Sequence, residues 1–170
     1  MRNTTKQDKL SLLLTTIYLA AVSAVILFKF PFRGDDFGTV RVIELIPFYV
    51  SEIHDVSFFV SNIVYNFLFF IPFGVFVCLL KPKWMFAKKI VVITLLSLSF
   101  EVVQFVLGIG ISDTTDLITN TTGGITGVGL YRVMQTIFKD KTHTIINVVA
   151  LILTVVMLML FGAAYGTMIR

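Results

Sequence analysis

Five apolar runs constrain the fold of this chain more than any other feature. They cover residues 10–28, 58–80, 89–107, 116–137 and 144–164. A helix needs about 20 mostly apolar residues to cross a bilayer, and only 14% of the 170 residues are charged, where a soluble domain has about 25%. We therefore expect an all-α membrane protein in which residues 1–170 form a single domain, a compact bundle of five transmembrane helices.

The distribution of lysine and arginine predicts how this bundle is oriented. With the N-terminus in the cytoplasm, only Lys29, Arg33, Arg41 and Arg170 fall on the outer side, and the other basic residues fall in cytoplasmic segments. Cytoplasmic loops carry an excess of basic residues in membrane proteins. The N-terminus should therefore lie inside and the C-terminus outside.

The connection between the first two runs, residues 29–57, is the only long loop. Its central part, V-R-V-I-E-L-I-P-F-Y-V over residues 40–50, is largely apolar but too short to cross a bilayer. We expect this part to lie along the outer interface or to re-enter the bundle. There it would act either as a packing lid or as one wall of a site open to the outer leaflet.

Acids and amides gather where the third and fourth runs approach the outer surface. An ionisable group inside a transmembrane helix costs roughly 2.5–3.5 kcal/mol on insertion scales, so such residues are rare without a role. A rise of about 1.5 Å per residue places them in the outer half of the bilayer, together with one asparagine of the second run. We expect six residues to line a ligand-binding pocket: Asn66, Glu101, Gln104, Asp113, Asp116 and Asn120.

Two of these acids also have structural interpretations. Asp116 stands at the predicted start of the fourth helix, where an acid is favoured as an N-cap. Glu101 has either a functional role or a single structural hydrogen bond, to Asn66 or Asn120. The sequence leaves both alternatives open.

Small residues of the fourth helix are expected to let a neighbouring helix approach closely. Gly123 and Gly127 form a G-x-x-x-G pattern, which lets helix backbones approach each other. A proline inside the second run should kink that helix, because it removes a backbone donor. The expected packing positions are Pro72, Gly74, Gly123, Gly124 and Gly127.

The residue types limit the chemistry that such a pocket supports. His54 and His143 fall on opposite sides of the membrane in this topology, so they share neither a metal nor a Ser-His-Asp arrangement. The single cysteine allows no disulfide within the chain. Carboxylates and amides suit a divalent cation such as Mg²⁺, with Glu101 or Asp116 as ligand or general base. They suit hydrogen bonding to a sugar or peptide headgroup equally well, so the sequence assigns neither a metal nor an enzyme activity.

Four motifs together resemble a known family. Asn66 to Gly74 reads N-F-L-F-F-I-P-F-G, Glu101 to Gln104 reads E-V-V-Q, and Asp113 to Gly124 reads D-T-T-D-L-I-T-N-T-T-G-G. Glu44 to Phe48 reads E-L-I-P-F, with glutamate where the pattern usually has asparagine. In this order and at this spacing, the motifs resemble those of the VanZ-like family over roughly residues 41–130.

The resemblance implies a multi-pass protein of the bacterial plasma membrane that takes part in cell-envelope chemistry. The founding family member resembles a resistance factor that lowers sensitivity to the glycopeptide teicoplanin. The chain departs from the family pattern near Gly110, where an arginine often stands, and at Thr115, where the second aspartate is often doubled. If that arginine binds an anionic headgroup in relatives, this chain binds such a group differently.

Three functions remain as expectations. The first is a resistance protein that binds a lipid-linked cell-wall precursor, another membrane lipid or a glycopeptide antibiotic in the outer polar pocket. The second is a metal-assisted hydrolase or transferase acting on such a precursor. The third is a structural helper that contacts another membrane protein through its glycine stripe. Nucleic acid is not expected as a partner, and the oligomeric state stays open.

Overall fold

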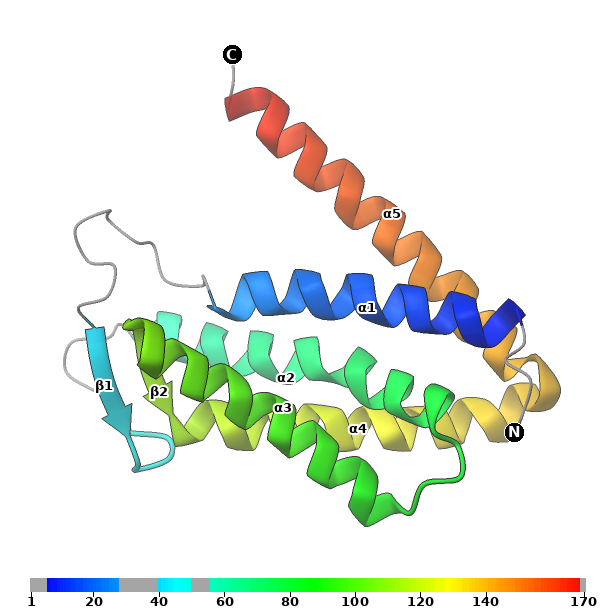
Figure 1. Ribbon diagram of the computed structural model, residues 1–170, viewed down its shortest axis with the longest axis horizontal. Coiled ribbons are helices and arrows are strands. Elements are labelled where there is room, and N and C mark those ends of the chain that lie inside the picture. The colour runs from blue at the N-terminus through cyan, green and yellow to red at the C-terminus, as the bar shows by residue number, and fades with distance from the viewer. Residues whose placement is uncertain (1–5, 28–39, 50–55, 169–170) are drawn as a thin grey trace.

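The computed structural model describes residues 6–27, 40–49 and 56–168, and the side chains of all of these except residues 40, 58 and 156–168. Five long helices dominate it (Figure 1). They are α1 (Lys6–Leu27), α2 (Val56–Leu80), α3 (Phe86–Leu107), α4 (Thr114–Phe138) and α5 (Thr142–Met168), with a short 3-10 helix η2 (Lys139–Lys141) between the last two.

Three of the helices are long and apolar enough to cross a membrane. These segments are Lys6–Leu27, Phe59–Leu80 and Phe86–Leu107. The chain is therefore a mostly helical membrane protein. Five membrane crossings and the N-inside orientation stay predictions.

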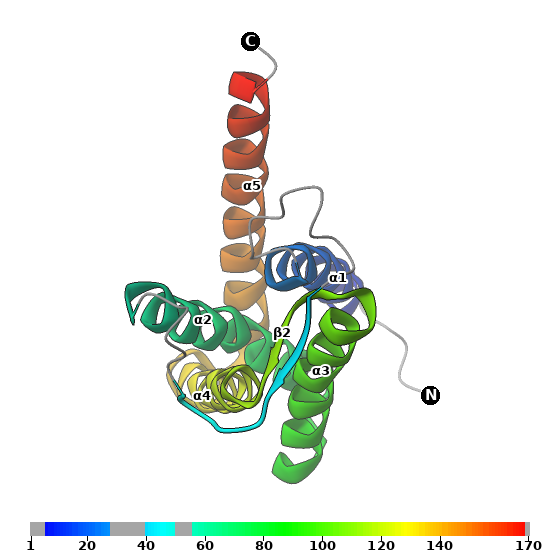
Figure 2. The same cartoon turned by 90° about the vertical axis from the view of Figure 1, so that its left-hand side faces the viewer.

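The first four helices run alongside one another, whereas α5 leaves this group at a wide angle (Figure 1). The view along the long axis shows α1 to α4 clustered together and α5 standing away from them (Figure 2). Polar side chains tie the beginning of α5 to the beginning of α1: Gln7 bonds Thr144 at 3.0 Å, and Ser11 bonds Asn147 at 2.9 Å.

Helices α2 and α4 pack backbone against backbone. A Cβ atom added to Gly123 would collide with the carbonyl oxygen of Phe67, and one added to Gly127 with that of Ile71. A Cβ atom on Gly74 would meet the carbonyl oxygen of Gly124 in the same way. These glycines face a neighbouring helix of the same chain, so the glycine stripe is buried inside the bundle.

A small parallel sheet, absent from the sequence-based expectation, caps one end of the bundle. Strand β1 (Val40–Glu44) pairs with β2 (Ile109–Asp113), with Glu44 opposite Asp113. Gly108 ends α3 in the left-handed conformation at φ 62°, which glycine adopts without steric cost, and β2 follows directly. The all-α prediction is thus incomplete, since residues 109–113 form a strand rather than a simple turn.

Aromatic rings separate this capped end from the centre of the bundle. Phe70 of α2 contacts Phe100 of α3, with ring centroids 6.2 Å apart, and Phe73 with centroids 6.0 Å apart. All three are buried, together with Ile93 and Val128 deeper in the core. Asn66, Glu101 and Gln104 lie toward the sheet from these rings along their own helices. Asn120 instead bonds Ser97, which is about one turn of α3 further from the sheet than Phe100.

Candidate functional site

The capped end holds a layer of buried polar side chains between the helices. Asn66, Glu101, Gln104, Asp116 and Asn120 are each at most 6% exposed. They come from α2, α3 and α4, so the tertiary structure gathers residues that the sequence scatters over more than fifty positions. We call this set the polar layer.

Glu101 fixes the sheet to the bundle. Its Oε2 accepts a hydrogen bond of 2.9 Å from the backbone N–H of Asp113, and its own carbonyl oxygen accepts one of 2.7 Å from Ser112 Oγ. The expected hydrogen bond from Glu101 to Asn66 or Asn120 is not the one observed. The carboxylate instead bonds the strand that directly follows its own helix, because β2 folds back over the end of α3.

Asp113, and not Asp116, is the N-cap of α4. The Asp113 side chain accepts a hydrogen bond of 2.7 Å from the N–H of Thr115. The helix begins at Thr114, two residues before the predicted start, which leaves Asp116 inside the first turn. The interpretation of Asp116 as the N-cap is therefore wrong.

Asp116 joins α4 to α2. Its Oδ1 accepts a hydrogen bond of 2.9 Å from Asn62 Nδ2. The hydroxyl of neighbouring Thr115 accepts one of the same length from the N–H of Phe48, which holds the segment after β1 over the polar layer. The segment after β1 therefore lies against the site, as a lid or wall would.

Two further residues belong to the site and were missed in the sequence. Asn62 lies four residues before Asn66, hence on the same face of α2, and this spacing was a usable signal. Ser97 accepts a hydrogen bond of 3.0 Å from Asn120 Nδ2. A lone serine in an apolar helix carries no signal by itself.

Three amide atoms of the polar layer have no hydrogen-bond partner among the described residues. They are Asn66 Nδ2, Gln104 Oε1 and Asn120 Oδ1. The opposite end of Gln104 is bonded, because its Nε2 donates to the carbonyl oxygen of Ile26 at 3.1 Å. Leaving a buried polar atom unsatisfied costs about 1–3 kcal/mol, so these atoms mark a region that a further polar group would stabilise.

The contacts between helices show the depth of each of these amides in the bundle. Asn66 lies between Asn62, which bonds Asp116, and Phe67, which abuts Gly123. Asn120 lies between those same two positions of α4. On α3, Gln104 lies two turns from Ser97, the partner of Asn120, which is a rise of about 10 Å. Asn66 and Asn120 thus lie at similar depth, whereas Gln104 lies about 10 Å closer to the sheet.

The described residues give limited support to a metal site. No three His, Cys, Asp or Glu side chains in the described part of the chain converge on a point that a metal ion could occupy. Mg²⁺ often uses only one or two carboxylates and completes its shell with water and substrate phosphates. The polar layer is therefore better supplied for hydrogen bonding than for a closed protein cage.

The remaining candidates lie apart from the polar layer or outside the described residues. His143 lies at the other end of the bundle, 3.7 Å from the carboxylate of Asp8. Arg41 of β1 stands opposite Gly110 of β2, the position where the resembling family often carries an arginine. His54 and Arg33 fall outside the described residues.

Comparisons with known proteins identify the family of this chain. The family model described as VanZ/LLP1 matches residues 15–139, which includes the helices and strands that build the polar layer. The chain is similar to the protein VanZ of Enterococcus faecium, with 28% identity over 152 residues that cover 87% of this chain and 89% of the relative. No solved structure matches the chain. The chain belongs to the VanZ/LLP1 family.

Proposed function

We propose that this protein acts in the bacterial plasma membrane and lowers sensitivity to teicoplanin-type glycopeptides by binding a ligand in its polar layer. The ligand is a lipid-linked envelope molecule or the lipid-bearing drug itself. Membership of the VanZ/LLP1 family and similarity to the protein VanZ support a role at the cell envelope.

The unsatisfied amides of the polar layer carry the proposal. Asn66 Nδ2 is a donor, whereas Gln104 Oε1 and Asn120 Oδ1 are acceptors, and all three residues are at most 2% exposed. A hydrocarbon chain satisfies none of these atoms. A sugar or peptide group offers both donors and acceptors, so it matches the set and recovers the desolvation cost.

The experiment expresses the protein in a teicoplanin-sensitive Gram-positive host and measures the inhibitory concentration of the drug. Asn66→Ala removes the unsatisfied donor and breaks no described bond of that atom, so it should abolish most of the resistance. Glu101→Gln, which keeps an acceptor oxygen for the Asp113 N–H, should lower resistance less.

A matched control lies on the exposed side of α4. Within the described part of the chain, the Thr126 side chain bonds only the carbonyl oxygen of Thr122 on its own helix, so Thr126→Ala should keep wild-type resistance. Vancomycin serves as the drug control, because it lacks the lipid tail of teicoplanin. Wild-type resistance in Asn66→Ala protein, at equal membrane abundance, would overturn the proposal.

A further inference from the structure

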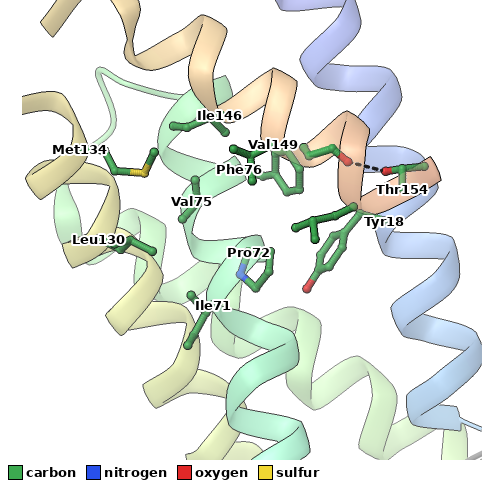
Figure 3. A pocket seen from close by; sticks show the side chains of 12 residues that line it. Tyr18, Ile71, Pro72, Val75, Phe76, Leu130, Met134, Ile146, Val149 and Thr154 are labelled. Carbon is green, nitrogen blue, oxygen red and sulfur yellow. Dashed lines mark hydrogen bonds between the residues drawn. The ribbon is translucent and has the colours of Figure 1, made fainter. Parts of the chain in front are cut away.

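A cavity lies between helices α2, α4 and α5, away from the polar layer, and Tyr18 of α1 also lines it. It has a volume of about 340 Å³, within the range of small-molecule sites. We call it the α5 groove, and its walls include Pro72, Val75, Leu130, Met134, Ile146 and Val149 (Figure 3).

The groove and the polar layer lie on opposite faces of α2. Val75 follows Asn66 by nine residues, which is about two and a half helical turns, so the two side chains point in opposite directions. The polar face of α2 meets α4 through the bond from Asn62 to Asp116. The groove is therefore a separate site.

The lining of the groove suits the hydrocarbon part of a ligand and offers no free partner to a polar group. Its two hydroxyl groups are already bonded inside the protein. Tyr18 donates to the carbonyl oxygen of Phe69, and Thr154 donates to that of Ala150 at 2.8 Å (Figure 3). The mouth is open, since Leu130 is 44% and Val149 48% exposed. A chain entering from the bilayer would meet apolar atoms only.

One end of the groove closes at the basic turn between α4 and α5. Thr142 donates to the carbonyl oxygen of Met134, which ties this turn to the groove wall. Lys139 and Lys141 are exposed there on either side of Asp140, and neither lysine forms an ion pair within the described residues, so the turn has a net positive charge. Lys139 adopts φ 47°, a conformation that glycine reaches without strain but other residues rarely adopt. A lysine nevertheless occupies this position.

We propose that the α5 groove binds one acyl chain of an anionic phospholipid, whose phosphate lies against Lys139 and Lys141. The hydrocarbon lining selects the chain, and the basic turn selects the charge of the headgroup. The wide angle of α5 opens the groove to the lipid (Figures 1 and 2). This lipid site is independent of the ligand proposed for the polar layer.

The test uses tryptophan quenching by brominated lipids in vesicles. The chain has one tryptophan, so Trp84→Phe provides a silent background. In this background Leu130→Trp reports on the groove mouth. Leu95 on α3 is 57% exposed, so Leu95→Trp reports on bulk lipid. The vesicles are phosphatidylcholine with small fractions of brominated phosphatidylglycerol or brominated phosphatidylcholine.

The groove reporter should prefer phosphatidylglycerol about fivefold, because each basic side chain near an anionic lipid contributes about fivefold and Asp140 offsets one of the two lysines. The α3 reporter should show no such preference. Lys139→Gln with Lys141→Gln should remove the preference, whereas Lys81→Gln with Lys83→Gln, an equal change of charge in the turn between α2 and α3, should keep it.

Equal quenching by both lipids at both reporters would overturn the proposal, as would a groove reporter that neither lipid quenches because α5 has closed over it. If the reporters fail to fold, native mass spectrometry of the unaltered protein provides the readout. It should retain phosphatidylglycerol over phosphatidylcholine, and Ala150→Phe, which fills the groove, should abolish that retention. Retention without lipid preference in the unaltered protein would also overturn the proposal.

Discussion

Two asparagine–serine pairs cross this bundle and differ in one respect. Asn147 pairs with Ser11 between α5 and α1, and Asn120 pairs with Ser97 between α4 and α3, at 2.9 and 3.0 Å. Both asparagines are at most 3% exposed. The Asn147 amide is bonded at both ends, since its Nδ2 also donates to the carbonyl oxygen of Gln7 at 3.4 Å, whereas Asn120 Oδ1 has no partner among the described residues.

The satisfied Asn147 amide shows that a polar residue in a membrane bundle does not by itself mark a site. A satisfied pair is explained by helix packing, to which such bonds contribute about 0.6 kcal/mol on average. An unsatisfied buried atom costs more than that bond returns. The Asn147 pair therefore needs no function, whereas the Asn120 pair needs a ligand or another reason to persist.

The comparison depends first on a rigid framework between the two pairs, which the glycine seam of α2 and α4 provides. Gly127→Leu places a side chain against the carbonyl oxygen of Ile71 and should cost about 4 kcal/mol or more, so that little folded protein is recovered in detergent. Gly129 has nothing within 4 Å of an added Cβ atom, so Gly129→Ala should be neutral or stabilising by up to about 1 kcal/mol. Equal unfolding temperatures for both variants would show that the seam is not tight.

Glu101 belongs to the polar layer but has a hydrogen bond that stabilises the fold. Glu101→Ala leaves the N–H of Asp113 without its acceptor and should destabilise the protein by about 1–3 kcal/mol. Glu101→Gln retains an oxygen and should recover most of that loss. Thermal unfolding in detergent measures both, and equal losses would show that the Glu101 hydrogen bond to Asp113 does not stabilise the fold.

The two asparagines themselves give the most direct contrast. Asn147→Leu breaks a satisfied pair and should destabilise the protein by about 1–2 kcal/mol while leaving teicoplanin resistance intact. Asn120→Leu loses the bond to Ser97 but also removes an unsatisfied buried atom, so it should destabilise the protein less than Asn147→Leu and lower resistance. Unfolding temperature and inhibitory concentration, measured on the same two variants, would contradict the comparison if both variants lost stability and resistance in parallel.

The smallest effect concerns the cap that presents the polar layer. Asp113→Ala removes the acceptor for the N–H of Thr115 and should cost about 1 kcal/mol. Asparagine caps about as well, so Asp113→Asn should restore stability. A loss of resistance in Asp113→Asn at wild-type stability would show that the charge of Asp113, and not its cap, serves the site.

Much of the helical framework is visible in the sequence. All five predicted runs begin two to four residues inside the observed helices. They end within one residue of the observed ends, apart from the last run, because α5 extends four residues beyond it to Met168. Gly108 marks the end of α3, and the G-x-x-x-G pattern lies on the face of α4 that meets α2. These features follow from local composition and from the period of one helix, which a single sequence contains.

The small sheet and the bonding of the polar layer were decided only by the tertiary structure. The V-R-V-I-E stretch of β1 pairs with I-G-I-S-D, which lies far along the chain, and neither stretch contains a signal that predicts this pairing. Whether Asn120 or Asn147 is satisfied depends on which side chain faces it across two helices. The sequence by itself determined which residues are polar and where the helices run; only packing decided which polar atoms find partners, because hydrogen bonding requires distances of about 3 Å that spacing along one helix does not determine.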